Sequence, residues 1–123
     1  MKKDNDNIIV IKSKTFALRS IKLYRYMIEE EHEYVLSKQF LRSATSIGAN
    51  VKEAIRGQSD ADFGAKMNIS LKEASETEYW LELMQESEYI PFDEGENMLA
   101  ACRELIRILT AIVKTTFENN KQK

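Results

Sequence analysis

The sequence contains very few residues that end helices or cross-link the chain. One proline and four glycines in 123 residues leave room for only a few turns, so long helices are expected. The single cysteine, Cys102, excludes an intrachain disulfide. A chain without disulfides fits a reducing compartment, and we expect the protein to be cytoplasmic.

Long apolar runs are missing as well. No run approaches the ~20 residues that a membrane-spanning helix requires, so no membrane partner is expected. The N-terminal segment 1–12 is charged, and its apolar run at 8–11 is too short for a signal peptide. A chain of 123 residues fits one domain whose core needs neither disulfide nor metal.

Histidine occurs once, and this limits the chemistry that the chain can perform. Di-iron sites in four-helix bundles need two Glu-x-x-His motifs. The spacing from Glu29 to His32 supplies one, and His32 is the only histidine. Cys102 falls on an apolar stripe, where cysteine usually serves as a small hydrophobic residue, and the scattered glycines form no phosphate-binding loop. We therefore expect no catalytic residues, no metal, no cofactor and no enzymatic activity.

A net positive charge, the usual mark of a nucleic-acid-binding domain, is also lacking. The formal net charge is −2, and the segment 73–96 contains many acidic residues and no lysine or arginine. Lysines instead gather toward the termini, as Lys2, Lys3, Lys12, Lys14, Lys121 and Lys123. In an antiparallel bundle this distribution predicts an acidic pole and a basic pole, whose fields would steer partners.

The most regular pattern that is present lies in residues 36–54. Apolar residues recur there at steps of three and four, which is the period of a helix with one buried stripe. The stripe consists of Leu36, Phe40, Ala44, Ile47, Val51 and Ala54. Gly48 and the surrounding serines and alanines would let a neighbouring backbone approach closely. We expect an inner helix that is packed on two sides.

Three further stripes predict an all-α fold, an antiparallel up-down-up-down four-helix bundle. These stripes are Phe16, Ser20, Leu23 and Met27; Phe63, Met67, Ser70, Ala74, Thr77 and Leu81; and Leu99, Cys102, Ile106, Leu109 and Val113. The predicted parts are a flexible N-terminal arm over 1–11, a bundle over 12–119 with helices at about 13–31, 37–57, 60–87 and 93–118, and a C-terminal tail over 120–123.

Particular residues mark the expected helix ends. Ser13, Ser37 and either Ser59 or Asp60 are predicted N-caps, because their side-chain oxygens can accept hydrogen bonds from free backbone N–H groups. Gly57 is predicted to end the second helix in a left-handed conformation.

Two motifs in the second and third helices resemble a known family. LRSATSIGANVKEA (41–54) and DFGAKMNISLKEASETEYWLELM (62–84) are similar to the bacterial proteins encoded in intervening sequences of 23S ribosomal RNA genes, the S23 or IVS-protein family. The resemblance covers roughly residues 12–117. It implies an antiparallel four-helix bundle that assembles as a ring, typically a homopentamer, with no known reaction. A related branch, the accessory variability determinant of diversity-generating retroelements, binds a reverse transcriptase and nucleic acid.

The outer sides of the second and third helices mix polar and apolar residues. A single charge there usually belongs to a solvated face, but Trp80 and two aliphatic residues beside carboxylates favour a subunit interface. The predicted interface consists of Arg42, Ser46, Asn50, Glu53, Ile69, Glu73, Glu76, Trp80 and Leu83. We expect Arg42 to pair with a glutamate of the neighbouring subunit.

Two basic sets are candidates for nucleic-acid contact. They are Arg19, Lys22 and Arg25 on the first helix, and Arg103, Arg107 and Lys114 on the fourth. Clustered cations would bind phosphates, and the two sets are candidates for one adjoining surface. The alternative is that these residues only keep the bundle soluble.

These observations predict a non-enzymatic, homo-oligomeric binding or scaffold module, with a pentamer as the expected assembly. The expected client is RNA or a protein that handles nucleic acid. The alternative is a purely structural assembly protein that binds no nucleic acid.

Overall fold

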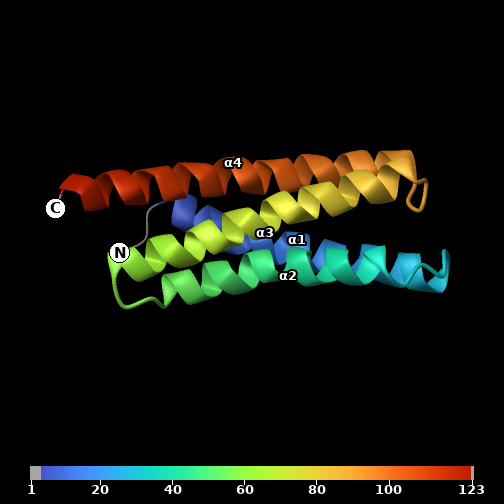
Figure 1. Cartoon of the computed structure of the whole chain (residues 1–123), viewed down its shortest axis with the longest axis horizontal. Coiled ribbons are helices and arrows are strands. Elements are labelled where there is room, and N and C mark those ends of the chain that lie inside the picture. Colours follow the sequence, from blue (N-terminus) through green and yellow to red (C-terminus); the bar gives the residue numbers. More distant parts are fainter. Residues whose placement is uncertain (1–3, 123) are drawn as a thin grey trace.

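The computed structural model describes residues 4–122, and the side chains of residues 6–119. It contains four helices, α1 (Asp4–Glu29), α2 (Leu36–Ile55), α3 (Asp60–Glu86) and α4 (Phe92–Gln122), and no strand within the described range. Consecutive helices run antiparallel along one long axis (Figure 1). The predicted all-α, up-down-up-down four-helix bundle is therefore confirmed.

The first helix begins earlier than predicted. Residues 4–11, which were expected to belong to a flexible arm, continue α1 without a break. The reason is that the buried stripe extends back to Ile9, which is fully buried in the core. The complete stripe is Ile9, Ser13, Phe16, Ser20, Leu23 and Met27. Ser13 is thus a small buried residue within the helix, and its prediction as an N-cap is wrong. The first three residues of the predicted arm, 1–3, lie outside the described range.

The start of α2 is capped by a residue that the sequence pattern did not indicate. The Glu33 carboxylate accepts hydrogen bonds from the backbone N–H groups of Val35 (3.1 Å), Leu36 (3.0 Å) and Ser37 (2.7 Å). The predicted N-cap, Ser37, instead lies inside the helix and donates its hydroxyl to the Glu33 carbonyl at 2.7 Å. A carboxylate at a helix N-terminus satisfies free N–H groups and opposes the positive end of the helix dipole.

The other helix ends agree with the predictions in part. Ser59 caps α3, because its hydroxyl accepts a hydrogen bond from the N–H of Asp62 at 3.0 Å. Gly57 follows α2, but no glycine in the described chain has a positive φ, so the predicted left-handed end is wrong. The left-handed residues are His32 and Glu88, in the α1–α2 and α3–α4 loops. The last helix continues through Gln122, beyond the predicted limit of 118, so the predicted tail is helical up to that residue.

Small polar residues inside the core join neighbouring helices. The Ser70 hydroxyl donates to the carbonyl oxygen of Ile47 at 2.8 Å, and the Thr77 hydroxyl donates to Ser43 Oγ at 2.8 Å. Cys102 Sγ donates to the carbonyl oxygen of Ala74 at 3.3 Å. These bonds satisfy groups that would otherwise be costly to bury, and they fix α3 against both α2 and α4.

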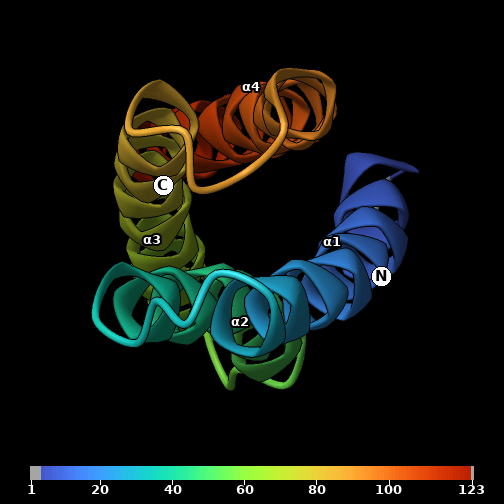
Figure 2. The same cartoon turned by 90° about the vertical axis from the view of Figure 1, so that its right-hand side faces the viewer.

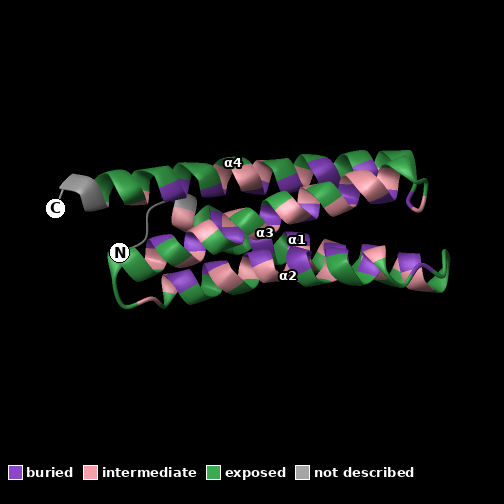
Figure 3. Cartoon of the chain, in the orientation of Figure 1, coloured by how far each residue is buried: buried purple, intermediate pink, exposed green. Residues whose placement is uncertain are grey.

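The helices follow one another around the bundle in chain order (Figure 2). The helices α2 and α3 each have extensive contacts with both neighbours, whereas the contact between α1 and α4 is the least extensive in the bundle. Buried residues form inward stripes along the helices, and the outer faces are exposed (Figure 3). The predicted inner role of α2 is confirmed.

One end of the bundle carries many exposed acidic residues. The α1–α2 and α3–α4 loops lie at the same end (Figure 1), with exposed Glu30, Glu31, Glu86, Glu88 and Asp93 on or beside them. Of the lysines expected at the other pole, Lys12 and Lys14 are described and exposed on the N-terminal half of α1. The side chains of Lys2, Lys3, Lys121 and Lys123 lie outside the described part. No described helix is long and apolar enough to cross a membrane.

Candidate functional site

The structure brings the nine predicted interface residues onto one side of the molecule, along the seam between α2 and α3. We call this surface the α2–α3 face. It consists of Arg42, Ser46, Asn50 and Glu53 of α2 and of Ile69, Glu73, Glu76, Trp80 and Leu83 of α3. The two sets meet where Arg42 of α2 pairs with Glu73 and Glu76 of α3, and these two helices form the most extensive contact in the bundle.

A charged cluster lies at the centre of this face. The Arg42 guanidinium contacts both Glu73 carboxylate oxygens at 3.4 Å and also pairs with Glu76. The Trp80 indole N–H donates to the same Glu76 carboxylate at 2.9 Å. Hydrogen bonding to Glu76 raises the pKa of Arg42, and hydrogen bonds from Trp80 and Arg42 hold the pKa of Glu76 below its ordinary value despite partial burial.

Arg42 has partners within its own chain. Both glutamates belong to the same chain as Arg42, and the pairing of Arg42 with a glutamate of a neighbouring subunit stays a prediction. The sequence could not reveal the pairing within the chain, because residues 42, 73 and 76 come together only through the packing of α2 on α3. The cluster therefore joins two helices of one subunit, and its Glu76 also accepts the hydrogen bond from the Trp80 indole.

The remaining polar groups of the face also have partners within the chain. Ser46 donates its hydroxyl to the Arg42 carbonyl at 2.7 Å, and the Asn50 amide donates to the Ser46 carbonyl at 2.9 Å. Glu53 pairs with Lys66 of α3 at 3.0 Å, and this hydrogen bond raises the pKa of Lys66. A face whose polar groups are already satisfied can pack against another surface without leaving unpaired groups behind.

Apolar side chains remain exposed on this face. Ile69 is 41% exposed, and Trp80 is half-buried against the core. Tyr79, which was not among the predicted residues, is 54% exposed, and its ring lies 5.4 Å from that of Trp80. The sequence signal for Tyr79 was its position directly beside Trp80. Exposed aromatic and aliphatic groups beside satisfied polar groups are typical of protein interfaces.

The two basic sets do not form one surface. Arg103 points toward α3, where it pairs with Glu78 at 2.8 Å and Glu82 at 3.5 Å. The next residue, Glu104, points toward α1 and pairs with Lys12 at 3.2 Å. Arg107 follows Arg103 after four residues, and Lys114 follows Arg107 after seven. Both spacings return to the same side of a helix, so the two residues extend along the α3 side of α4. The expected adjoining surface with α1 is therefore wrong.

Most of the predicted nucleic-acid contacts are nevertheless accessible. Lys22, Arg25, Arg107 and Lys114 are exposed, and none of them belongs to an ion pair within the described chain. Arg19 is only partly exposed, and Arg103 is neutralised by Glu78. The surface offers two separate pairs of unpaired cations on different helices.

The groups that could perform catalysis lie apart. Cys102 is fully buried, and burial raises the pKa of its thiol to about 12, so the thiolate is not formed near neutral pH. His32 lies in the α1–α2 loop, where its ring contacts the Tyr34 hydroxyl at 3.3 Å. Within the described residues, no group of three or more histidine, cysteine, aspartate or glutamate side chains is arranged to hold a metal ion.

Comparisons with known proteins agree with the resemblance seen in the motifs. The sequence model of the 23S rRNA-intervening sequence protein family matches residues 5–111. A crystal structure of a protein with unknown function from the S23 ribosomal protein family, from Bacteroides thetaiotaomicron VPI-5482, is 49% identical with a TM-score of 0.88. The match covers 89% of this chain and 98% of that chain. A comparison with curated proteins gives no match.

Proposed function

The chain belongs to the 23S rRNA-intervening sequence protein family, and from this membership and the α2–α3 face we propose that it is a non-enzymatic, homo-oligomeric binding or scaffold module. The observation that carries the proposal is that exposed Ile69 and Tyr79 and half-buried Trp80 lie beside satisfied polar residues. Burial of this face against another subunit would remove apolar surface from water at no cost in unpaired charge.

The proposed assembly is a ring of five subunits. The family resemblance implies a pentamer, and a ring needs a heterologous contact between two different surfaces of the chain. The α2–α3 face would supply one of these surfaces. The proposed setting is the cytoplasm of a bacterium, which fits the buried, unpaired thiol of Cys102.

RNA is the proposed client. The unpaired cations Lys22 and Arg25 on α1 and Arg107 and Lys114 on α4 would contact phosphates. In a ring these pairs would repeat around the assembly, so weak contacts of each subunit would add up through multivalency.

A purely structural assembly without nucleic-acid binding is the alternative. It is favoured by the net charge of −2 and by the neutralisation of Arg103. The α2–α3 face serves the assembly equally well in both cases, so oligomerisation alone does not distinguish them.

The experiment is light scattering on a sizing column with absorbance recorded at nucleic-acid and protein wavelengths. We expect a mass near five times 14.3 kDa, together with excess nucleic-acid absorbance that disappears in high salt, because phosphate contacts release counterions. An assembled peak with a pure protein spectrum would favour the structural alternative. A peak at 14.3 kDa would refute the oligomer.

A further inference from the structure

A groove between α1 and α2 is not used by the proposed assembly face. Its volume is about 470 Å³, and its lining runs from Val10 to Ala17 on α1 and from Thr45 to Arg56 on α2. The α2 part corresponds to roughly 16 Å of helix at 1.5 Å per residue. The groove follows the side of α2 that faces α1, whereas the α2–α3 face lies on the other side.

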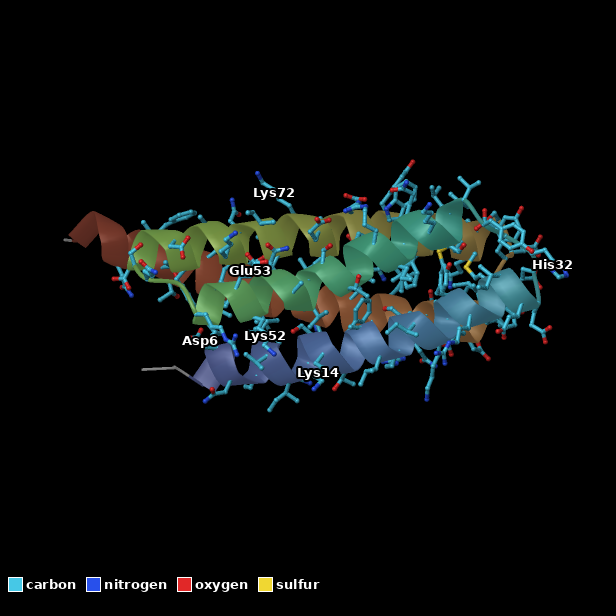
Figure 4. All side chains as sticks on the ribbon, turned by 90° about the horizontal axis from the view of Figure 1, so that it is seen from below. Asp6, Lys14, His32, Lys52, Glu53 and Lys72 are labelled. Atoms are coloured by element: carbon cyan, nitrogen blue, oxygen red, sulfur yellow. The ribbon has the colours of Figure 1, made fainter. Side chains whose placement is uncertain are left out.

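Three cations surround this α1–α2 groove. Lys14, Lys52 and Arg56 all line it, and the lining contains no acidic residue. None of the three belongs to an ion pair within the described chain. Figure 4 shows Lys14 and Lys52 on the same side of the bundle, and Lys72 of α3 on the opposite side. The lining therefore contains three cations and no acidic side chain, and Asp6 of α1 lies near Lys52 at one end of the groove in the same view (Figure 4).

The floor of the groove is lined by apolar side chains, two of which are alanines. It is formed by Val10, Ala17, Ala49 and Ile55, with Gly48 facing Ser13 of α1. A Cβ atom at position 48 would lie 3.4 Å from Ser13 Oγ and 3.5 Å from the Ser13 carbonyl oxygen, which are ordinary van der Waals distances, so α1 and α2 pass close to each other at this point. Small residues along a helix pair leave space into which side chains of a third helix can fit.

We propose that the α1–α2 groove binds an amphipathic helix of a partner protein, with apolar side chains on the floor and acidic residues beside Lys14, Lys52 and Arg56. Recognition of this kind combines an apolar helix face with charges on the flanks. Single-stranded nucleic acid fits less well, because it is usually held by stacking on aromatic rings and no aromatic side chain lines the groove.

A second copy of this chain is a poorer occupant than a different protein. The occupant needs an outward stripe that is apolar and acidic without cations. The chain has one stripe of this kind, Ile69, Glu73, Glu76, Trp80 and Leu83 on α3, but its two glutamates are already paired with Arg42 of α2. The other described helices carry exposed cations on their outer sides: Lys22 and Arg25, Lys38, and Arg107 and Lys114. Such residues would be brought toward the cations of the groove and repel them.

The test uses the full chain and a synthetic, fluorescein-labelled helical peptide of about 18 residues, long enough to cover the groove. The peptide carries leucines at helical spacing on one face and glutamates on both flanks. Fluorescence anisotropy should show saturable binding. We expect Lys52→Glu, which reverses a rim charge, and Ala49→Phe, which fills the floor, each to weaken binding about tenfold.

Matched variants elsewhere on the surface serve as controls. Lys72→Glu makes the same charge change on α3, and Ala111→Phe adds the same ring at an exposed position of α4. We expect both to bind the peptide like the unchanged protein. Equal binding by all variants, equal binding of a peptide with lysine in place of glutamate, or no saturable binding would each refute the proposal.

Two further readouts separate the other occupants. If Lys52→Glu or Ala49→Phe changes the mass seen by light scattering, the groove contacts a second copy and the proposal fails. If labelled single-stranded RNA binds with the same dependence on both variants, the groove is a nucleic-acid site and the proposal also fails. An unchanged mass with selective loss of peptide binding supports it, whatever the outcome for the ring.

Discussion

Single residues decide where the helices of this bundle begin and how they are fixed to one another. Glu33 is the clearest case, because its buried carboxylate accepts three backbone hydrogen bonds at the start of α2. Burial raises the pKa of Glu33, but the hydrogen bonds from Leu36, Ser37 and Val35 outweigh this effect, and the pKa lies below its ordinary value of 4.5. By contrast, the Arg42 side chain is half-exposed. Its pairs with Glu73 and Glu76 orient these three side chains but add little to the free energy of unfolding.

The lowered pKa of Glu33 predicts a pH-dependent contribution to stability. Because its folded-state pKa lies below its unfolded-state pKa, the ionised group stabilises the fold near neutral pH, and this stabilisation is lost as the pH falls below about 4.5. We expect Glu33→Gln to lower the free energy of unfolding by about 1 kcal/mol at pH 7. Urea unfolding at several pH values should show the difference from the unchanged protein shrinking in acid.

The control for this substitution is Glu118→Gln, the same change at an exposed position of α4. It should leave stability almost unchanged at every pH. A difference for Glu33→Gln that stays constant from pH 7 to about pH 3 would contradict the assigned role of the carboxylate.

At the level of the elements, α1 shows how a periodic stripe prevails over a local end signal. Ser13 is a good N-cap residue in isolation, yet it lies four residues after Ile9 and three before Phe16 on the buried stripe. Burial of the Ile9 side chain stabilises the helical conformation of the segment that extends back to Asp4. The outer side of the same segment remains apolar at Ile11, which is 66% exposed.

This arrangement predicts effects of very different size for the truncation of Ile9 and of Ile11. We expect Ile9→Ala to lower the free energy of unfolding by about 2 kcal/mol, because it leaves a cavity in the core. Ile11→Ala should change it by less than about 0.5 kcal/mol, since an exposed position loses little on truncation. Chemical denaturation followed by circular dichroism measures both. Similar, negligible effects would mean that residues 4–11 do not belong to the folded unit.

At the scale of the whole molecule, α2 separates two surfaces with different properties. Its α3 side forms part of the α2–α3 face, where exposed apolar groups accompany satisfied ion pairs. Its α1 side lines a groove with unpaired cations. One inner helix therefore supports two surfaces that two different partners could occupy at the same time.

The proposed assembly predicts that a charge on the α2–α3 face will disrupt it. Ile69→Glu should shift the light-scattering mass toward 14.3 kDa while helicity is retained, because burial of an unpaired carboxylate at a subunit interface is costly. Leu18→Glu, at an exposed position of α1, provides the control and should leave the mass unchanged. A mass that is lowered only by Leu18→Glu would place the interface on α1.

The sequence by itself determined the number of helices, their inward stripes and the family, because helical period and the scarcity of helix-breaking residues act locally along the chain. It also placed the nine residues of the α2–α3 face on the outer sides of their helices. Only the tertiary structure decided that Arg42 pairs within its own chain, that Arg103 faces α3 rather than α1, and that Lys14, Lys52 and Arg56 meet at one groove. The physical reason is that a period fixes the angle of a residue around its own axis, whereas the neighbour that it meets depends on how the helices pack together.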